Sequence, residues 1–430
     1  MANTTAGDAI EASSGNANTA SAGDAIEQPP GDAIAGVWAH HHGEWRDQSQ
    51  VVVQWPDAAA VDRRLFEHRV EGHWWETLDS QQLTLIVPRE YEHLVMAMTV
   101  VAGRPFVSYL PLPHPSGIAI DRDRELVHIA STRNPNQVFD LTPANGVMKR
   151  LDAVDDDTDA ANRSLMPIRA RFFPGCLYMH DLALINGDLY ANSVGQNAIV
   201  RLGDDGRHTR VWWPKCIETD NGPVFGQNHL QLNSIAAGPS IQQSFFTASA
   251  DHLSARRPGH QNFPVDRRGV IFDGTTREPL VRGLTRPHSA RLHEGDLWVD
   301  NSGYGELARV RDGQLETAAR LPGWTRGLAL NNGVAFVGTS RVIPRFRQYA
   351  PGLDVDASQC GIHAIDLASG RILGSLYWPN GNQIFGIDWL PRSMTTGFPF
   401  RASVRRGHER ERKLFYAFTI PTNESTNDRG

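Results

Sequence analysis

The stretch RPHSARLHEGDLWVDNSGYGEL, residues 286–307, carries the pattern that predicts the fold. HSARL reads as the start of a strand, HEG as a turn, DLWV as a second strand, NSGYG as a turn, and ELARV as a third strand. The histidine at the start, His288, is the unusual residue. A single histidine at a strand end is usually a packing residue, so the rest of the chain has to decide whether it belongs to a site.

The opening of this stretch recurs along the chain as a polar residue, a small residue and an alternating apolar run. It appears as SGIAI from Ser116, HDLAL from His180, NSIAA from Asn233, HSARL from His288, RGLAL from Arg326 and FGIDW from Phe385. Second strands follow at 125, 188, 244, 296 and 334, and third strands at 198, 269, 306 and 361. Six such units predict an all-β, six-bladed β-propeller. An irregular sandwich would also contain short apolar strands, but it would not need the shared opening.

The predicted blades begin near residues 116, 180, 233, 288, 326 and 385, within a propeller domain of residues 46–421. The sixth unit is short, so we expect strands before Ser116 to complete it and close the ring, which removes exposed sheet edges. The apolar residues in 57–76 have helical spacing, which predicts a helix outside the main domain. Uneven spacing predicts inserted loops at 151–174, 219–227, 250–266 and 341–359, and long loops on a rigid scaffold often carry recognition.

Both ends of the chain differ in composition from the predicted propeller. Residues 1–45 are of low complexity and contain GDAI three times. Segments of this kind bury too little apolar surface to fold, so residues 1–45 and 422–430 are predicted to be disordered tails.

Charge and cysteine content limit the classes of partner. The formal net charge is −6 and the sequence pI is about 6.3, which argues against nucleic acid as a partner. Cys176, Cys216 and Cys360 are far apart, which fits a reducing compartment. The sequence has no apolar stretch of membrane-spanning length and no secretory pattern at its start, so no membrane association and a cytoplasmic location are predicted.

The first strand of a propeller blade lies closest to the central axis, so the six opening residues are predicted to converge at the mouth of the channel. His180 and His288, with His229 or Asn233 as a third donor, would suit one divalent transition metal such as zinc, copper or iron. Arg326 would hold a small anionic ligand or peptide, because its planar guanidinium offers fixed donors. Arg326 and Asp181 are therefore the candidate catalytic residues, and Ser116, Asn233 and Ser289 are candidate ligand-binding residues.

Several of these polar and cysteine residues can also be explained by a structural role alone. Each histidine could instead donate to a backbone carbonyl and fill the channel. Asp300 and Asn301 could bind a hard cation or simply favour a turn. Cys360 begins a predicted strand, where a buried structural thiol is expected rather than a nucleophile.

Several motifs together resemble an uncharacterised bacterial β-propeller family of conserved hypothetical proteins, sometimes associated with tetratricopeptide-repeat proteins. They are MHDLAL, NHLQLNSIA, GLTRPHSARLHEGDLWVDNSGYGEL, GWTRGLAL and CGIHAID, within residues 82–392. The resemblance implies the propeller fold and adds Arg291 to the motif positions, as a further ligand-binding candidate. The segment at Phe385 and Gly386 departs from the family pattern. At the level of the fold, the repeat also looks like six-bladed lactonases and metal-dependent peptide amidating lyases, an analogy that does not fix function.

These observations predict a metal-dependent lyase, hydrolase or oxidase acting on an anionic small molecule or peptide. The alternative is a propeller without catalysis that binds a ligand, or binds a protein partner through its inserted loops.

Overall fold

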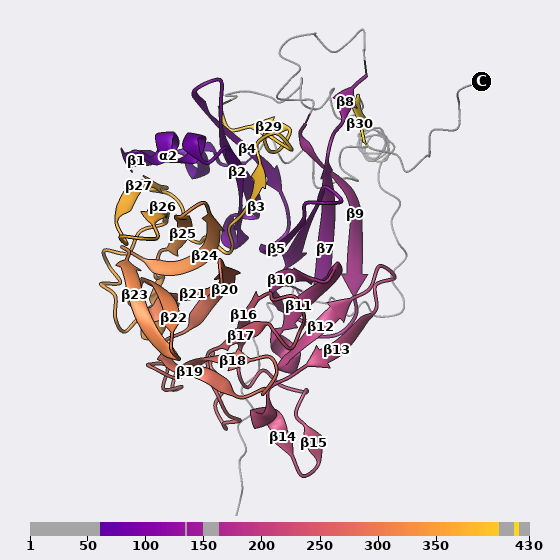
Figure 1. The fold of residues 1–430 in the computed structure, drawn as a ribbon, viewed down its shortest axis with the longest axis vertical. Helices are drawn as coiled ribbons and strands as arrows, with labels where there is room; N and C mark the ends of the chain where they lie inside the picture. Colours follow the sequence, from indigo (N-terminus) through magenta and orange to yellow (C-terminus); the bar gives the residue numbers. More distant parts are fainter. Residues whose placement is uncertain (1–60, 134–135, 149–162, 404–416, 421–430) are drawn as a thin grey trace, which may run out of the picture. The chain divides into compact units, whose positions relative to one another are not determined.

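The computed structural model describes residues 61–133, 136–148, 163–403 and 417–420. These residues form six antiparallel sheets of four or five strands, arranged as the blades of a propeller (Figure 1). The prediction of an all-β, six-bladed propeller is confirmed. The predicted tails at 1–45 and 422–430 lie outside the described residues.

Blades one to four each contain four strands, ordered from the axis outward. Blade one is β5 (Pro115–Asp121), β6 (Leu126–Ser131), β7 (Asn136–Pro143) and β9 (Leu165–Phe173); blade two is β10 (Met179–Ile185), β11 (Asp188–Ser193), β12 (Ala198–Leu202) and β13 (His208–Trp212); blade three is β16 (Leu232–Ala236), β17 (Phe245–Ala248), β18 (Gly269–Asp273) and β19 (Pro279–Leu284); blade four is β20 (Pro287–His293), β21 (Asp296–Asn301), β22 (Glu306–Arg311) and β23 (Gln314–Arg320).

Blades five and six each gain a strand from a distant part of the chain. Blade five is β24 (Trp324–Asn331), β25 (Val334–Ser340), β26 (Gly361–Asp366), β27 (Ile372–Tyr377) and the N-terminal β1 (Arg69–Gly72); blade six is the C-terminal β28 (Asp388–Pro391), then β2 (Leu83–Arg89), β3 (Leu94–Val101), β4 (Arg104–Pro111) and β29 (Phe400–Arg401). The N-terminal strands β2, β3 and β4 thus complete the sixth blade, as predicted. Consecutive innermost strands are neighbours all round, including β28 with β5, so the ring is closed.

Smaller elements connect or cover the blades. They are η3 (Arg63–Phe66), α2 (Trp74–Ser80), η4 (Glu90–Glu92), β8 (Gly146–Val147), η5 (Val194–Gln196), η6 (Lys215–Ile217), β14 (Glu218–Thr219), β15 (Gly222–Pro223), η7 (Ser302–Tyr304), η8 (Pro344–Tyr349) and β30 (Phe418–Thr419). No helix in the described part of the chain has the length and apolar character needed to cross a membrane.

One predicted element differs from the observed structure. The expected helix at 57–76 is wrong for its described part, which holds η3, the strand β1 and only the start of α2. Pairing of β1 with the outer edge of blade five explains the difference, because it satisfies backbone groups that a lone helix would satisfy internally. The sixth blade was predicted to begin near Phe385, and its regular pairing with β2 begins at Asp388.

In five of the six units, the polar–small opening corresponds to a β-bulge. In β5, β10, β16, β20 and β24, the register with the second strand shifts by one residue at the opening polar residue or just after it. A bulge bends the strand and re-aims its side chains, and bulges are common beside functional sites. The repeated sequence motif is therefore the signature of a repeated backbone irregularity next to the axis.

The small residue of each opening joins its blade to the next one. The Oδ2 atom of Asp181 accepts a hydrogen bond from the backbone N–H of Ile235 at 3.0 Å. Ser234 accepts in the same way from Ala290, and Ser289 accepts from Gly327 at 2.8 Å. These bonds connect blades two to five in sequence around the axis. Gly117 occupies the equivalent position in blade one, where a Cβ atom would lie 2.5 Å from the Asp181 backbone.

Candidate functional site

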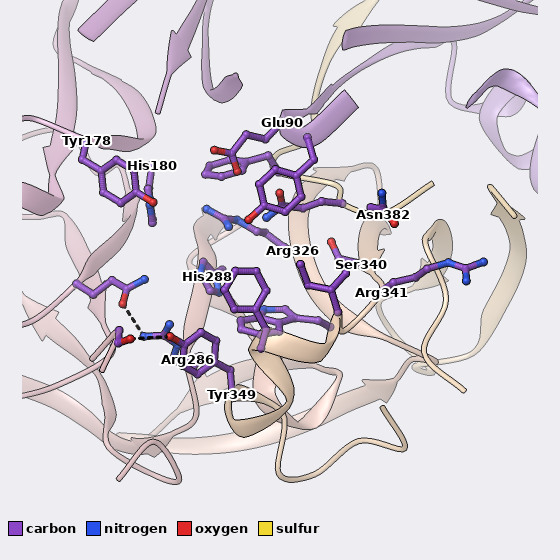
Figure 2. Close-up of a pocket in the computed structure, with 18 of the residues that line it drawn as sticks. Glu90, Tyr178, His180, Arg286, His288, Arg326, Ser340, Arg341, Tyr349 and Asn382 are labelled. Carbon is purple, nitrogen blue, oxygen red and sulfur yellow. Dashed lines mark hydrogen bonds between the residues drawn. The ribbon is translucent and has the colours of Figure 1, made fainter. Parts of the chain in front are cut away.

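A cavity of about 210 Å³ lies where the innermost strands begin (Figure 2). It is lined by polar and aromatic residues from several blades: Glu90, Tyr91, Tyr178, His180, Asn228, Gln231, Arg257, Gly259, Arg286, His288, Trp324, Arg326, Ser340, Arg341, Ile343, Phe346, Tyr349, Asn382, Gln383 and Phe385. The opening residues His180, His288, Arg326 and Phe385 therefore do come together from four blades.

A second set of lining residues stands two positions before the opening residues. These are Tyr178, Gln231, Arg286, Trp324 and Gln383. Tyr178, Gln231 and Arg286 have left-handed φ angles of 53°, 51° and 53°. Such angles are unfavourable for residues other than glycine and often mark functional sites. Sequence reasoning missed this set, although the offset of two residues in the same alignment was the available signal.

Arg326 is the most unusual side chain in the cavity. It is 8% exposed, and its Cζ atom lies 3.3 Å from the centroid of the Phe385 ring. Within the described residues, its guanidinium has no hydrogen-bond acceptor and no carboxylate at ion-pair distance. Burial lowers the pKa of Arg326 to about 10. A buried guanidinium with unused donors is suited to an anionic ligand.

Two buried arginines outside the cavity, Arg89 and Arg171, have acidic partners. Arg89 forms an ion pair with Glu92 at 3.1 Å, and Arg171 forms one with Asp140 at 2.8 Å. Buried charges normally need such partners. The contrast makes packing alone a poor explanation for Arg326.

His180 and His288 face the same cavity as neutral imidazoles. Burial and the nearby charge of Arg326 hold the pKa of both histidines well below the ordinary value. The Nδ1 atom of His180 lies 3.3 Å from Oδ1 of Asn233, an acceptor, so Nδ1 carries the proton. This leaves Nε2 of His180 as a free acceptor, with no hydrogen bond from any described residue. The Nδ1 atom of His288 lies 2.9 Å from the hydroxyl of Ser302.

Glu90 is the one acidic residue among those that line the cavity. It belongs to η4 in the closing blade and is 3% exposed. Burial raises the pKa of its carboxyl, while a hydrogen bond donated by the Thr132 hydroxyl opposes the shift. The sequence analysis did not select Glu90, because only ring closure brings the β2–β3 loop beside Thr132 of blade one and Arg326 of blade five.

Besides His229, five predicted site residues do not line this cavity. Asp181 receives a bidentate ion pair from Arg291, with N–O distances of 2.8 and 3.1 Å. Asn233 orients His180 and donates to the carbonyl of Pro287 at 2.9 Å, while Ser116 donates to the carbonyl of Met179. Ser289 takes part in the bond between blades described above. Their side chains hold the inner wall in place, in a layer below His180, His288 and Arg326.

A metal centre does not fit the observed donors. His229 is absent from the residues lining the cavity, and its backbone N–H donates to Asn197. The described residues contain no group of three histidine, cysteine, aspartate or glutamate side chains placed to hold one ion. The guanidinium of Arg326, close enough to affect both histidines, would also repel a cation. The predicted zinc, copper or iron is therefore not confirmed, and no chemistry is derived from it.

Two of the predicted inserted loops contribute to the cavity. Arg257 and Gly259 come from the loop at 250–266, and Ile343, Phe346 and Tyr349 come from the loop at 341–359. The ring of Phe346 stacks on Tyr349 at 5.4 Å. Cys360, in contrast, is buried away from the cavity, and burial raises the pKa of its thiol to about 12, as expected for a structural cysteine.

The fold and the site together define a six-bladed β-propeller with an arginine-lined and aromatic cavity at the mouth of its channel. Within this class, the chain belongs to the family described as a domain of unknown function (DUF4915), which matches residues 72–397. This match confirms the predicted resemblance to an uncharacterised family. No curated protein matches the sequence.

Solved structures with similar folds include a nidogen/laminin complex, at 10% identity over 71% of this chain and 98% of that chain, with a TM-score of 0.47. A protein of unknown function from Bacteroides caccae matches at 12% identity over 72% and 98%, with a TM-score of 0.46. A gluconolactonase from Xanthomonas campestris matches at 13% identity over 70% and 86%, with a TM-score of 0.40. At these values, the likeness says nothing about substrate or activity.

Proposed function

We propose that this propeller binds a small organic anion in the cavity, with the anionic group on Arg326. The observation that carries the proposal is the buried guanidinium of Arg326, which has unused donors among the described residues and stands beside two neutral histidines. An anion would compensate a buried charge for which the described residues provide no acidic partner. Four arginines and one glutamate line the cavity, and this excess of positive charge also favours a negatively charged ligand.

The size and lining of the cavity describe the rest of the ligand. Its volume of about 210 Å³ exceeds the roughly 150 Å³ that holds one benzene ring. Trp324, Phe346 and Tyr349 form an aromatic wall on one side. A ligand with one ring or a short apolar chain therefore suits the cavity. Side chains of two inserted loops line it, which favours a small molecule over a protein partner.

The proposal is tested with pairs of anionic and neutral molecules of the same shape, such as benzoate with benzamide and butyrate with butyramide. Thermal melting and calorimetry of the full chain should show binding of the anions and much weaker binding of the amides. Arg326→Met should abolish the difference, while Arg201→Met, at an exposed site, should preserve it. Equal behaviour of anions and amides across the pairs would refute the proposal.

A second candidate function is acid–base catalysis on the bound anion, favoured by the arrangement of His180 and Glu90. His180 is neutral, with a free Nε2 atom oriented through Asn233, and the raised pKa of Glu90 favours a protonated carboxyl in the same cavity. A general base and a general acid of this kind serve lyases and hydrolases. Arg326 would stabilise negative charge that develops next to the anionic group.

Catalysis is tested by incubating the protein with carboxylates in deuterated water and following proton exchange and turnover by NMR. We expect exchange with the natural protein and its loss in His180→Gln, with Arg326-dependent binding retained. If every carboxylate that binds through Arg326 remains unchanged, the site is a binding site without this chemistry.

A further inference from the structure

The cavity contains a second buried arginine without a carboxylate partner. Arg286 is 4% exposed, and no carboxylate of the described residues lies at ion-pair distance from it. Its Nε atom is buried without a hydrogen-bond partner there. Burial also lowers the pKa of Arg286 to about 10.

Arg286 is held in a defined orientation. Its Nη1 atom donates to Oε1 of Gln231 at 2.5 Å, and its Cζ atom lies 3.9 Å above the ring of Tyr349. Its backbone has a left-handed φ angle of 53° just before β20 begins. A guanidinium fixed by an uncharged amide and an aromatic ring is oriented and keeps its positive charge, as a recognition site for an anion requires.

Arg286 and Arg326 occupy different parts of the cavity. Arg326, His180 and His288 also border a small void of about 10 Å³ deeper in the channel, whereas Arg286 does not. Arg286 precedes blade four and Arg326 lies in blade five. The Trp324 ring lies 6.0 Å from that of His288 and 5.9 Å from that of Tyr349, so an aromatic surface continues from one arginine's surroundings to the other's.

We infer that the ligand is a dianion, a small molecule with two carboxylate or phosphate groups joined by a short apolar or aromatic body. One group would bind Arg326 beside the histidines, and the other would bind Arg286 nearer the mouth. This inference rests on the proposed anion site at Arg326, to which it adds the second contact and the class of ligand. A single anion would leave one of the two buried guanidinium groups unpaired.

Calorimetry with matched skeletons tests the inference. The probes are benzoate, benzene-1,3-dicarboxylate, benzene-1,4-dicarboxylate and 4-carboxyphenyl phosphate, with butyrate, glutarate and adipate as an aliphatic series. The best dianion should bind about 10- to 100-fold more tightly than the monoanion of its skeleton, the range of one charge-assisted hydrogen-bonded contact. Carboxylate and phosphate probes of equal charge distinguish the two kinds of group.

Variants separate the two contacts. Arg286→Met should bring dianion affinity down to the monoanion level and leave monoanion affinity within about twofold. Arg286→Lys keeps the charge without the planar guanidinium, and it should retain part of the preference for dianions over monoanions. This partial retention would show that the loss in Arg286→Met does not come from a folding defect. Arg326→Met should weaken both kinds of ligand.

The outcomes distinguish this inference from the function on which it rests. If monoanions bind through Arg326 but no dianion binds more tightly, or if Arg286→Met weakens both kinds equally, the dianion inference is wrong and the anion site stands. If no anion of either kind depends on Arg326, both are wrong.

Discussion

Arg326 is buried and Arg291 is half-buried beside the same channel, and their replacement should change stability in opposite directions. Arg326 has no acidic partner among the described residues, while Arg291 holds Asp181 through two N–O contacts. Without ligand, Arg326→Met removes an uncompensated charge. Arg291→Met leaves the carboxylate of Asp181 buried and unpaired.

The magnitude for Arg326 follows from its pKa. Burial lowers this pKa from 12.5 to about 10, and at about 1.4 kcal/mol per pKa unit the charged form is destabilised in the folded state by roughly 3 kcal/mol. The lost contact between cation and Phe385 ring offsets about 1 kcal/mol. Arg326→Met should therefore raise the free energy of unfolding by about 2 kcal/mol. Because the folded pKa is lowered, this penalty is complete at every pH below about 10.

Arg291→Met should lower the free energy of unfolding by about 3 kcal/mol, because it leaves the buried carboxylate of Asp181 without its cationic partner. Urea unfolding at pH 7 without added anions measures both variants against the natural protein. If the Arg326→Met protein is more stable but no longer binds benzoate, the buried charge of Arg326 lowers stability and is needed for binding. If Arg326→Met instead destabilises the protein as much as Arg291→Met, Arg326 has a structural role and the reasoning fails.

Two further predictions concern stability. Burial lowers the pKa of His180, His288 and His363, the last to about 3, so the unfolded chain takes up protons first as the pH falls below about 6.5. The free energy of unfolding should then fall by up to about 1.4 kcal/mol per pH unit for each histidine, and the contribution of His363 should continue towards pH 3. Urea unfolding midpoints from pH 7.5 to 4.5 measure this fall in stability. A midpoint that does not change with pH would contradict the prediction. Gly117→Ala would place a Cβ atom 2.5 Å from the backbone of blade two and should lower the free energy of unfolding by about 2 kcal/mol. Gly226→Ala is the control and should change stability little, because no atom lies within 4 Å of its added Cβ atom. Equal shifts in melting temperature for the two variants would contradict the prediction and show that the blades relax at the axis.

The repeated opening was visible in the sequence because it has a local physical cause. Most innermost strands have a bulge and a small residue beside the axis, so residues such as Gly117, Ser234 and Gly327 recur at one position of the repeat. The same periodicity predicted correctly that His180 and Arg326 would meet. Regular pairing in the sixth blade begins at Asp388, shortly after the predicted opening at Phe385, because its pairing partner is the distant strand β2.

The remaining parts of the site had weaker signals or none. Residue type does not reveal a left-handed backbone at Tyr178 or Gln231, because such angles are imposed by the surrounding chain. The partner of Asp181 could not be read from sequence either, since Arg291 reaches it from a blade that is not adjacent.

The sequence by itself determined the class of fold, the number of blades and the set of residues next to the axis, because strand periodicity, turns and bulges are local properties of the chain. The tertiary structure alone decided which of those residues face a ligand. Pairing with Arg291 places Asp181 in the wall, whereas ring closure brings Glu90 to the cavity and leaves the guanidinium of Arg326 facing it without an acidic partner among the described residues. Charge compensation depends on contacts between distant blades, and for that reason the chemistry of the site appears only in the folded ring.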